Sequence, residues 1–171
     1  AEAHNNLGNL LLEKDDPEAA ISCFNQAITL QPALIGAYIG LSNACRQQQR
    51  PTDSQAALHR ALALEPQNSD DLASLGAALN IAGLAEQAEQ CLQQVLQIQP
   101  QHAQASYLLG TLMNDQGKFD KAIEYFAAPI RQQANAAEAY FGVGIALQGL
   151  DQLGEAEIYY CRALSIQPDL A

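Results

Sequence analysis

The side chains able to perform covalent or metal chemistry are few and scattered. The four cysteines, Cys23, Cys45, Cys91 and Cys161, are widely separated and form no C-x-x-C pair, so the spacing of a zinc or redox site is missing. No serine or cysteine is spaced to take one of the three histidines as a base. The histidines also fall at unrelated points of the pattern described below. We therefore expect a non-catalytic protein with no cofactor and no metal site.

Composition and charge narrow the class of partner. Apolar residues make up 49% of the chain and charged residues 16%, which indicates a folded protein. Eight Lys and Arg stand against nineteen Asp and Glu, for a net charge of −11. This charge disfavours nucleic acid and anionic membrane surfaces as partners. No uninterrupted apolar run approaches the length of a membrane span. A protein or peptide ligand is the partner class that remains.

The thiols and the start of the chain bear on its location. Isolated cysteines used as small apolar residues suit a reducing compartment. The opening Ala1-Glu2-Ala3-His4 carries no signal peptide, and it lacks an initiator Met. We expect a cytoplasmic protein of which this sequence is an excerpt.

An internal repeat organises the whole sequence. Pro32, Pro66 and Pro100 are 34 residues apart, and Pro168 follows after 68 residues, which is twice that spacing. Other equivalent positions recur with the same spacing. One series is small: Gly8, Ser42, Gly76, Gly110 and Gly144. Another is bulky: Phe24, Leu58, Leu92, Phe126 and Tyr160. The 171 residues therefore divide into five units and one further residue. We expect a single domain, 1–171, built from units 1–34, 35–68, 69–102, 103–136 and 137–170.

Each unit has the pattern of two helices. Apolar residues recur at helical spacing on both sides of a break at Asp15-Asp16-Pro17. Asp16 is placed as an N-cap, with Pro17 in the first helical turn. Gly83 and Gly117 occupy the corresponding turn of later units and suit a left-handed residue after the first helix. Small residues at the eighth and twentieth positions let the two helices approach closely.

The fourth unit departs from this pattern. Pro129 stands where a small helical residue is expected, and Ala134 replaces the terminal proline. Proline lacks a backbone donor and clashes with the carbonyl four residues earlier, here that of Tyr125. We expect the second helix of this unit to kink or break.

These features resemble the tetratricopeptide repeat family, whose unit is a helix–turn–helix of about 34 residues. The resemblance covers residues 1–170. It implies an all-α, right-handed α-solenoid of about ten helices. The aromatic residue expected at the fourth position is present only as Tyr38 and Tyr140.

The family resemblance also implies a binding surface. In the family, one side of each first helix lines a concave groove, and repeat positions 2, 5, 9, 12 and 13 fall on that side. Amides at these positions could bind a peptide backbone, and two aromatic residues could hold an apolar side chain. The candidate residues are Asn5, Asn9, Ile39, Asn43, Arg46, Asn80, Tyr107, Asn114, Phe141 and Gln148. The function favoured is a protein-interaction scaffold that binds a peptide or helix of a partner in the groove.

Two family variants provide a comparison. Members that grip acidic chaperone tails use a Lys and Asn clamp, but Asn5, Gly40 and Asp70 stand at its key positions here. We expect no such clamp. The segment Glu2–Asn9 is similar to units in the repeat arm of O-linked N-acetylglucosamine transferases. This weaker similarity leaves open an alternative role, as a substrate-positioning arm of a larger multidomain transferase.

Charge and the last helix complete the expectations. The net charge by unit is −4, +1, −4, 0 and −4, so the second unit alone is positive. The last helix carries more apolar residues than one packing face requires: Ile158, Tyr159, Tyr160, Leu164 and Ile166. Because terminal repeats need a polar outer face, uncapped terminal helices suggest a further alternative, an end-to-end self-assembling scaffold.

Overall fold

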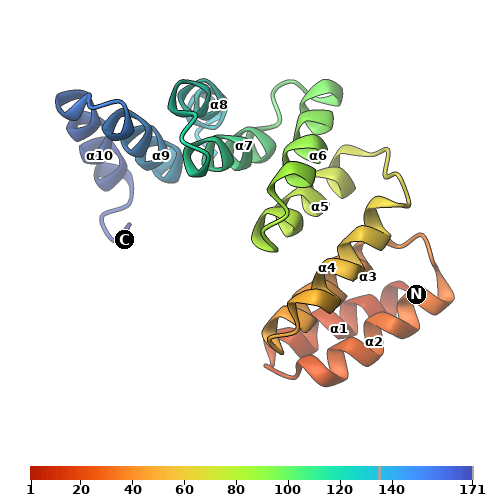
Figure 1. Ribbon diagram of the computed structural model, residues 1–171. Helices are drawn as coiled ribbons and strands as arrows, with labels where there is room; N and C mark the ends of the chain where they lie inside the picture. Colours follow the sequence, from red (N-terminus) through yellow and green to blue (C-terminus); the bar gives the residue numbers. More distant parts are fainter. Residues whose placement is uncertain (135, 171) are drawn as a thin grey trace. The chain divides into compact units, whose positions relative to one another are not determined.

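The computed structural model describes residues 1–134 and 136–170, and these residues are all-helical, with no strand among them (Figure 1). They form ten α-helices: α1 (Glu2–Glu13), α2 (Pro17–Leu30), α3 (Ile35–Gln47), α4 (Pro51–Leu62), α5 (Ser69–Ile81), α6 (Ala85–Ile98), α7 (Ala103–Asp115), α8 (Phe119–Gln132), α9 (Ala136–Gly149) and α10 (Leu153–Ile166). The expected all-α solenoid of helix–turn–helix repeats is confirmed.

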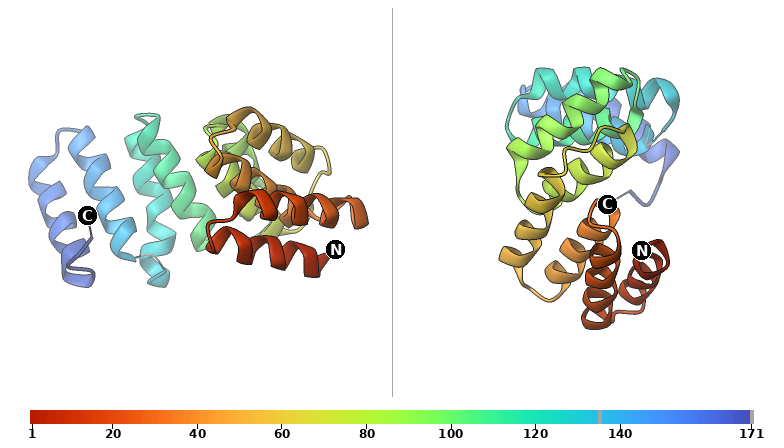
Figure 2. Two further views of the ribbon diagram at one scale, coloured as in Figure 1. Left: turned by 90° about the horizontal axis from the view of Figure 1, so that it is seen from below. Right: turned by 90° about the vertical axis from the view of Figure 1, so that its right-hand side faces the viewer.

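The chain forms two compact units, one from Ala1 to Cys91 and the other from Leu92 onward. In the first unit α1 pairs with α2 and α3 with α4, while α2 packs on α3 and α4 on α5. In the second unit α7 pairs with α8 and α9 with α10, while α8 packs on α9. The helices of a pair lie side by side (Figure 2). The hairpins that contact one another within a unit therefore bury their apolar faces partly against themselves and partly against the neighbouring hairpin.

Side-chain caps fix the start of several helices. The carboxylate of Asp16 accepts a hydrogen bond from the Ala19 amide at 3.1 Å, and Pro17 is the first residue of α2, as the sequence predicts. Asn68 caps α5 in the same way, and His102 caps α7 through Nδ1. The starts of α2, α5 and α7 are therefore stabilised by residues next to them in the sequence.

The first helix of every repeat ends in the same left-handed turn. The turn residue is predicted correctly at Gly83 and Gly117, whose φ angles are 78° and 70°. At the equivalent position of the other three repeats the left-handed residue is not glycine but Asp15, Gln49 or Asp151. In each turn the next amide reaches back five residues, as in the 2.9 Å bond from the Asp16 amide to the Leu11 carbonyl. These paired bonds satisfy carbonyls that the helix end would leave unpaired.

The expected break at Pro129 is not observed. One continuous helix, α8, runs from Phe119 to Gln132, and Pro129 lies buried within its last turn. A proline here removes one hydrogen bond, while its ring gains burial. The irregularity falls after the proline, where Gln133 is left-handed with φ 55° and the Ala134 amide bonds to the Pro129 carbonyl at 3.1 Å. This turn ends the helix in a repeat that lacks the terminal proline.

Aromatic rings held between glycines join successive hairpins. Phe24 is fully buried between Gly8 of its own repeat and Gly40 of the next, and a Cβ on either glycine would approach the ring closer than 3.0 Å. Phe126 occupies the same place between Gly110 and Gly142. The glycines are needed here for close approach of a large ring, which packs the core at the density of a protein interior.

Candidate functional site

The ten candidate residues all lie on the first helices of the repeats, α1, α3, α5, α7 and α9. In the first unit α3 contacts both α1 and α5, and in the second unit α7 contacts α9. The first helices of each unit are therefore neighbours, and they carry their candidate residues in adjacent rows. We call the surface that carries these residues in each unit the first-helix face of that unit.

In the first unit the candidate residues differ in exposure. Asn9 and Arg46 are exposed, whereas Ile39, Asn43 and Asn80 are partly buried. Asn5 is also partly buried, and its amide is the group nearest to the place that a Cβ on Gly36 of α3 would take. Its Oδ1 atom is inaccessible and has no hydrogen-bond partner among the described residues. Asn5 thus contributes to packing between the first two repeats.

Two candidate residues of α7 also make contacts within the fold. Tyr107 is partly buried, and its ring centroid lies 6.0 Å from that of Phe126, the ring held between glycines. Burial raises the pKa of Tyr107, and the carboxylate of Glu138 adds to this effect. Asn114 donates a 2.8 Å hydrogen bond from Nδ2 to the backbone carbonyl of Gly142 on α9. Both side chains therefore tie α7 to neighbouring helices.

The last repeat gathers candidate residues around a small cavity. Phe141 remains 41% exposed, and its ring centroid lies 5.5 Å from that of Tyr160 on α10. The Tyr160 hydroxyl donates a 2.8 Å hydrogen bond to Oε1 of Gln148. With Leu164 and Leu170 these three residues enclose about 260 Å³. We call this cavity, lined by Phe141, Gln148, Tyr160, Leu164 and Leu170, the α9–α10 notch.

Tyr160, Leu164 and Leu170 are not among the candidate residues chosen from the sequence. The repeat pattern does contain a signal for Tyr160, because Phe141 and Tyr160 stand at the same repeat positions as Tyr107 and Phe126. Both pairs form tilted ring contacts. Tyr160 and Leu164 lie on a second helix, α10, whereas the candidate residues were chosen only from first helices.

Two of the four thiols are packing residues, whereas Cys23 is partly buried and Cys161 is exposed. Cys45 and Cys91 are buried, and all four cysteines are free. Burial raises the pKa of both Cys45 and Cys91, and nearby Arg50 opposes the rise only at Cys45. These two thiols are accordingly weak nucleophiles at neutral pH. Among the described residues, no three His, Cys, Asp or Glu side chains are grouped to hold a metal ion.

Membrane insertion by a helix has no support in the part of the chain that the structure describes. The helices there are too short or too polar to cross a bilayer.

The fold defines a class of protein: tandem repeats of equal length, each a pair of antiparallel helices. Small residues and aromatic rings pack between neighbouring helices. Tetratricopeptide repeat models match residues 1–34, 39–103, 81–143 and 137–170. The chain belongs to the tetratricopeptide repeat family. Comparison with curated proteins gives no match.

Solved structures of similar fold include three repeat proteins. MamA is 25% identical, with a TM-score of 0.73 over 92% of this chain and 92% of that chain. YrrB, described as a TPR protein with an unusual peptide-binding site, is 24% identical, with a TM-score of 0.73 over 98% of this chain and 86% of that chain. PilF of Pseudomonas aeruginosa is 22% identical, with a TM-score of 0.77 over 95% of this chain and 75% of that chain. Family and fold together support a role as a protein-interaction scaffold.

Proposed function

We propose that this chain binds a peptide or a helix of a partner protein on the first-helix face of its second unit, with the α9–α10 notch as the main anchor point. The observation that carries the proposal is the notch itself. It places an exposed aromatic ring and a side-chain amide beside an apolar space of about 260 Å³. Apolar pockets with a few polar groups are the usual form of a binding site.

The two parts of the notch serve different parts of a ligand. Phe141 and Tyr160 present ring surface to an apolar side chain, and Leu164 is 48% exposed beside them. Gln148 accepts from the Tyr160 hydroxyl through Oε1, which fixes the amide and leaves its Nε2 hydrogens to donate to a peptide carbonyl. YrrB is described as having a peptide-binding site on this fold, and that description supports the ligand class proposed here.

The test is a peptide selection followed by variants. Peptides selected from a random library on the full chain should share a bulky apolar residue, and isothermal titration then measures their affinity. Phe141→Ala should weaken binding by about tenfold or more, as expected for a central aromatic anchor. Gln148→Ala should weaken it less. Ile158→Ala, which removes an exposed apolar side chain from α10 outside the notch, is the matched control. Selected peptides that bind both notch variants as tightly as the natural sequence would refute the proposal.

End-to-end association is a second candidate, favoured by the exposure of apolar side chains on the two terminal helices. Leu7 and Leu10 of α1 are each 45% exposed, and Leu153 and Ile166 of α10 are more than half exposed. The mass of the chain in solution, measured by light scattering over a range of concentrations, tests this role. Association should raise the mass with concentration, and Leu10→Ser should reverse it; a constant monomer mass would exclude it.

A further inference from the structure

A second cavity lies in the first unit, between α2 and α4. It encloses about 340 Å³, at the lower end of the roughly 300–1,000 Å³ typical of ligand pockets. Leu41 and Cys45 of α3 line it together with Ile21 of α2 and Ala57 of α4. Successive residues of a helix are about 100° apart, so Leu41 and Cys45 point away from the candidate residues Ile39 and Asn43. The cavity is therefore separate from the first-helix face of that unit.

Two consecutive alanines leave room for the cavity on the α4 side. Ala56 and Ala57 line it from α4. At the position of Ala57, the fourth and fifth repeats carry Tyr125 and Tyr159, and at the position of Ala56 the fifth repeat carries Ile158. The larger residues would occupy the space that the alanines leave. The fold thus accepts bulky side chains at this repeat position, and the second repeat has small ones.

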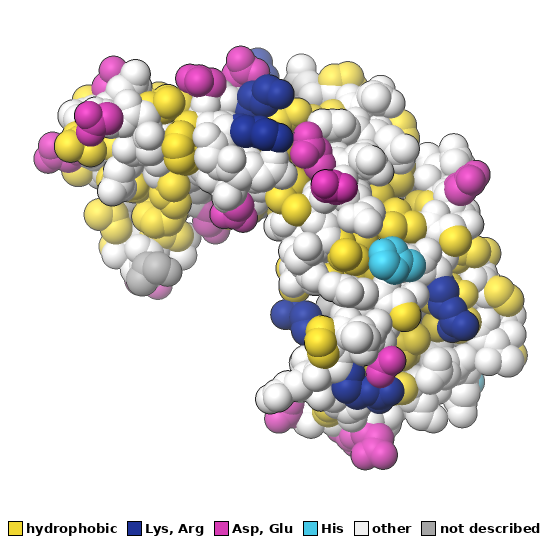
Figure 3. Space-filling view, viewed as in Figure 1, with side chains coloured by type: hydrophobic (Ala, Val, Ile, Leu, Met, Phe, Trp, Pro, Cys, Tyr) yellow, Lys and Arg dark blue, Asp and Glu magenta, His cyan; other side chains and the backbone are white. Residues whose placement is uncertain are grey.

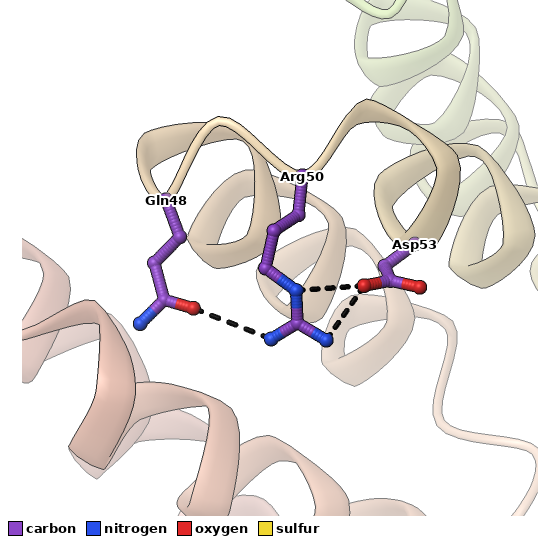
Figure 4. Close-up of polar contacts among 3 residues, drawn as sticks. All are labelled: Gln48, Arg50 and Asp53. Carbon is purple, nitrogen blue, oxygen red and sulfur yellow. Dashed lines mark hydrogen bonds and ion pairs between the residues drawn. The ribbon is translucent and has the colours of Figure 1, made fainter.

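The rim of the cavity is positively charged. Arg50 and Arg60 line it with a single carboxylate, that of Asp53. Arg50 pairs with Asp53 through Nε at 2.7 Å and through a second nitrogen at 2.6 Å, and it also donates to Gln48 at 3.3 Å (Figure 4). Arg60 makes no hydrogen bond or ion pair with the residues that the structure describes. One guanidinium at the rim is therefore free for a ligand.

The surroundings make this rim unusual for the chain. The second repeat has a net charge of +1 in a protein of net charge −11. In Figure 3, Lys or Arg side chains lie on the part of the surface formed by α1–α4, with hydrophobic atoms between them. Apolar walls and an unpaired guanidinium together select a ligand that is apolar and acidic. Cys45 is only 3% exposed and burial raises the pKa of its thiol, which makes it a weak nucleophile.

We propose that the α2–α4 cavity binds an acidic, apolar segment of a partner protein, in which a leucine-sized side chain enters the cavity and a neighbouring Asp or Glu carboxylate pairs with Arg60. The site is distinct from the α9–α10 notch and does not depend on the function proposed for it. A chain with both sites would hold two segments at once, which is the property of a scaffold.

The probe for this site is the blocked peptide acetyl-Glu-Leu-Glu-Leu-Glu-amide, compared with its Gln and Lys counterparts. Titrated into the isotope-labelled chain of residues 1–171, the Glu peptide should shift the backbone NMR signals of Ala56, Ala57 and Arg60. The Gln peptide should bind about tenfold more weakly, because a charge-assisted hydrogen bond is lost. The Lys peptide should not bind. Equal affinity of the Glu and Gln peptides would overturn the proposal.

Variants separate this cavity from general attraction to positive charge. Arg60→Gln should lower the affinity for the Glu peptide to that of the Gln peptide. Arg131→Gln, an exposed arginine of α8, makes the same change in net charge and should have no effect. Ala56→Ile should block binding through lost space; its side chain is exposed, and the chain carries Ile158 at the same repeat position. Circular dichroism checks that each variant is folded. Undiminished binding to both Arg60→Gln and Ala56→Ile, or signal shifts confined to the α9–α10 notch, would refute the proposal.

Discussion

The hydroxyl oxygens of Ser42 on α3 and Ser54 on α4 lie 2.7 Å apart. Both side chains are at most 2% exposed. The other four repeats have glycine and alanine at these two positions, as in Gly8 and Ala20. The second repeat therefore replaces a contact of small apolar groups with a buried hydrogen bond, and each hydroxyl has the other as its partner.

Removing both of these hydroxyls should cost less stability than the two single removals added together. Ser42→Ala leaves the Ser54 hydroxyl buried without its partner, at a cost of about 1–2 kcal/mol in the free energy of unfolding. The double variant Ser42→Ala/Ser54→Ala loses both groups and should cost less than the two single changes combined. Urea unfolding of the four proteins measures the coupling. Strict additivity would show that the Ser54 hydroxyl finds another acceptor, for instance the carbonyl of Arg50 one turn earlier.

A methyl group at Gly40 should be strongly destabilising. Its Cβ would fall within 3.0 Å of the Phe24 ring, which is fully buried. We expect Gly40→Ala to cost roughly 1–3 kcal/mol, as overpacking does in other cores. Gly36→Ala on the same helix is the control, because the nearest atoms belong to Asn5 at 3.8 and 3.9 Å.

The same contact offers a rescue. The third repeat places Ser74 at the position of Gly40, and there the preceding bulky residue is Leu58 instead of phenylalanine. Phe24→Leu combined with Gly40→Ala should therefore be more stable than Gly40→Ala alone, as measured by the midpoint of thermal unfolding. A double variant less stable than Gly40→Ala would show that the ring contributes more than the clash removes.

Glycine should stabilise the left-handed turns that lack it. Gln49 and Asp151 have φ angles of 58° and 61°, a conformation that costs free energy for any residue with a Cβ. Gln49→Gly should raise the free energy of unfolding by about 0.5–1 kcal/mol. Gly83→Ala should lower it by a similar amount, and purely through the backbone, since no atom lies within 4 Å of the added Cβ. Chemical denaturation of the natural sequence and the two variants measures these free energies of unfolding. If both substitutions changed stability in the same direction, glycine would not be the preferred residue of this turn.

Stability should fall in alkaline solution because of buried phenols. Burial raises the pKa of Tyr107 and Tyr160 above the ordinary value of 10.0, so the folded chain retains protons that the unfolded chain loses. Their contribution is complete below pH 10 and is lost as the pH rises through the folded-state pKa. Tyr107→Phe should leave stability at pH 7 unchanged and should reduce the loss between pH 9 and pH 11. Urea unfolding across this range measures the slope, and an identical slope in the variant would contradict the assignment.

Local features of the fold could be predicted because their causes lie within a few residues. The cap at Asp16 needs only a carboxylate three residues before the amide of Ala19, and the turns at Gly83 and Gly117 need only the freedom of glycine. Pro129 shows where local reasoning fails. The helix continues to Gln132 with the proline buried in its last turn, where the lost hydrogen bond lies close to the helix end.

The candidate site was predictable only in part, for the same reason. Repeat positions placed Phe141 and Gln148 on α9, but the notch forms only because Tyr160 and Leu164 approach them from α10. Asn5 and Asn114 follow the same positional rule and instead turn their amides toward neighbouring helices. Position on a helix wheel gives the direction of a side chain, whereas its exposure depends on what the adjacent helix supplies.

The sequence by itself determined the period of the repeat, the helix pairs with their turns, and the uneven charge that makes the second repeat alone positive. These features depend on residue spacing, on residues close together in the sequence or on composition, so they can be derived without the tertiary structure. The tertiary structure decided which small residues leave space and which are filled by a neighbour. Ala56 and Ala57 line a cavity, whereas the rings of Phe24 and Phe126 fill the space beside Gly40 and Gly142. The free volume beside a residue is set by side chains from other helices, so it exists only once the helices have packed.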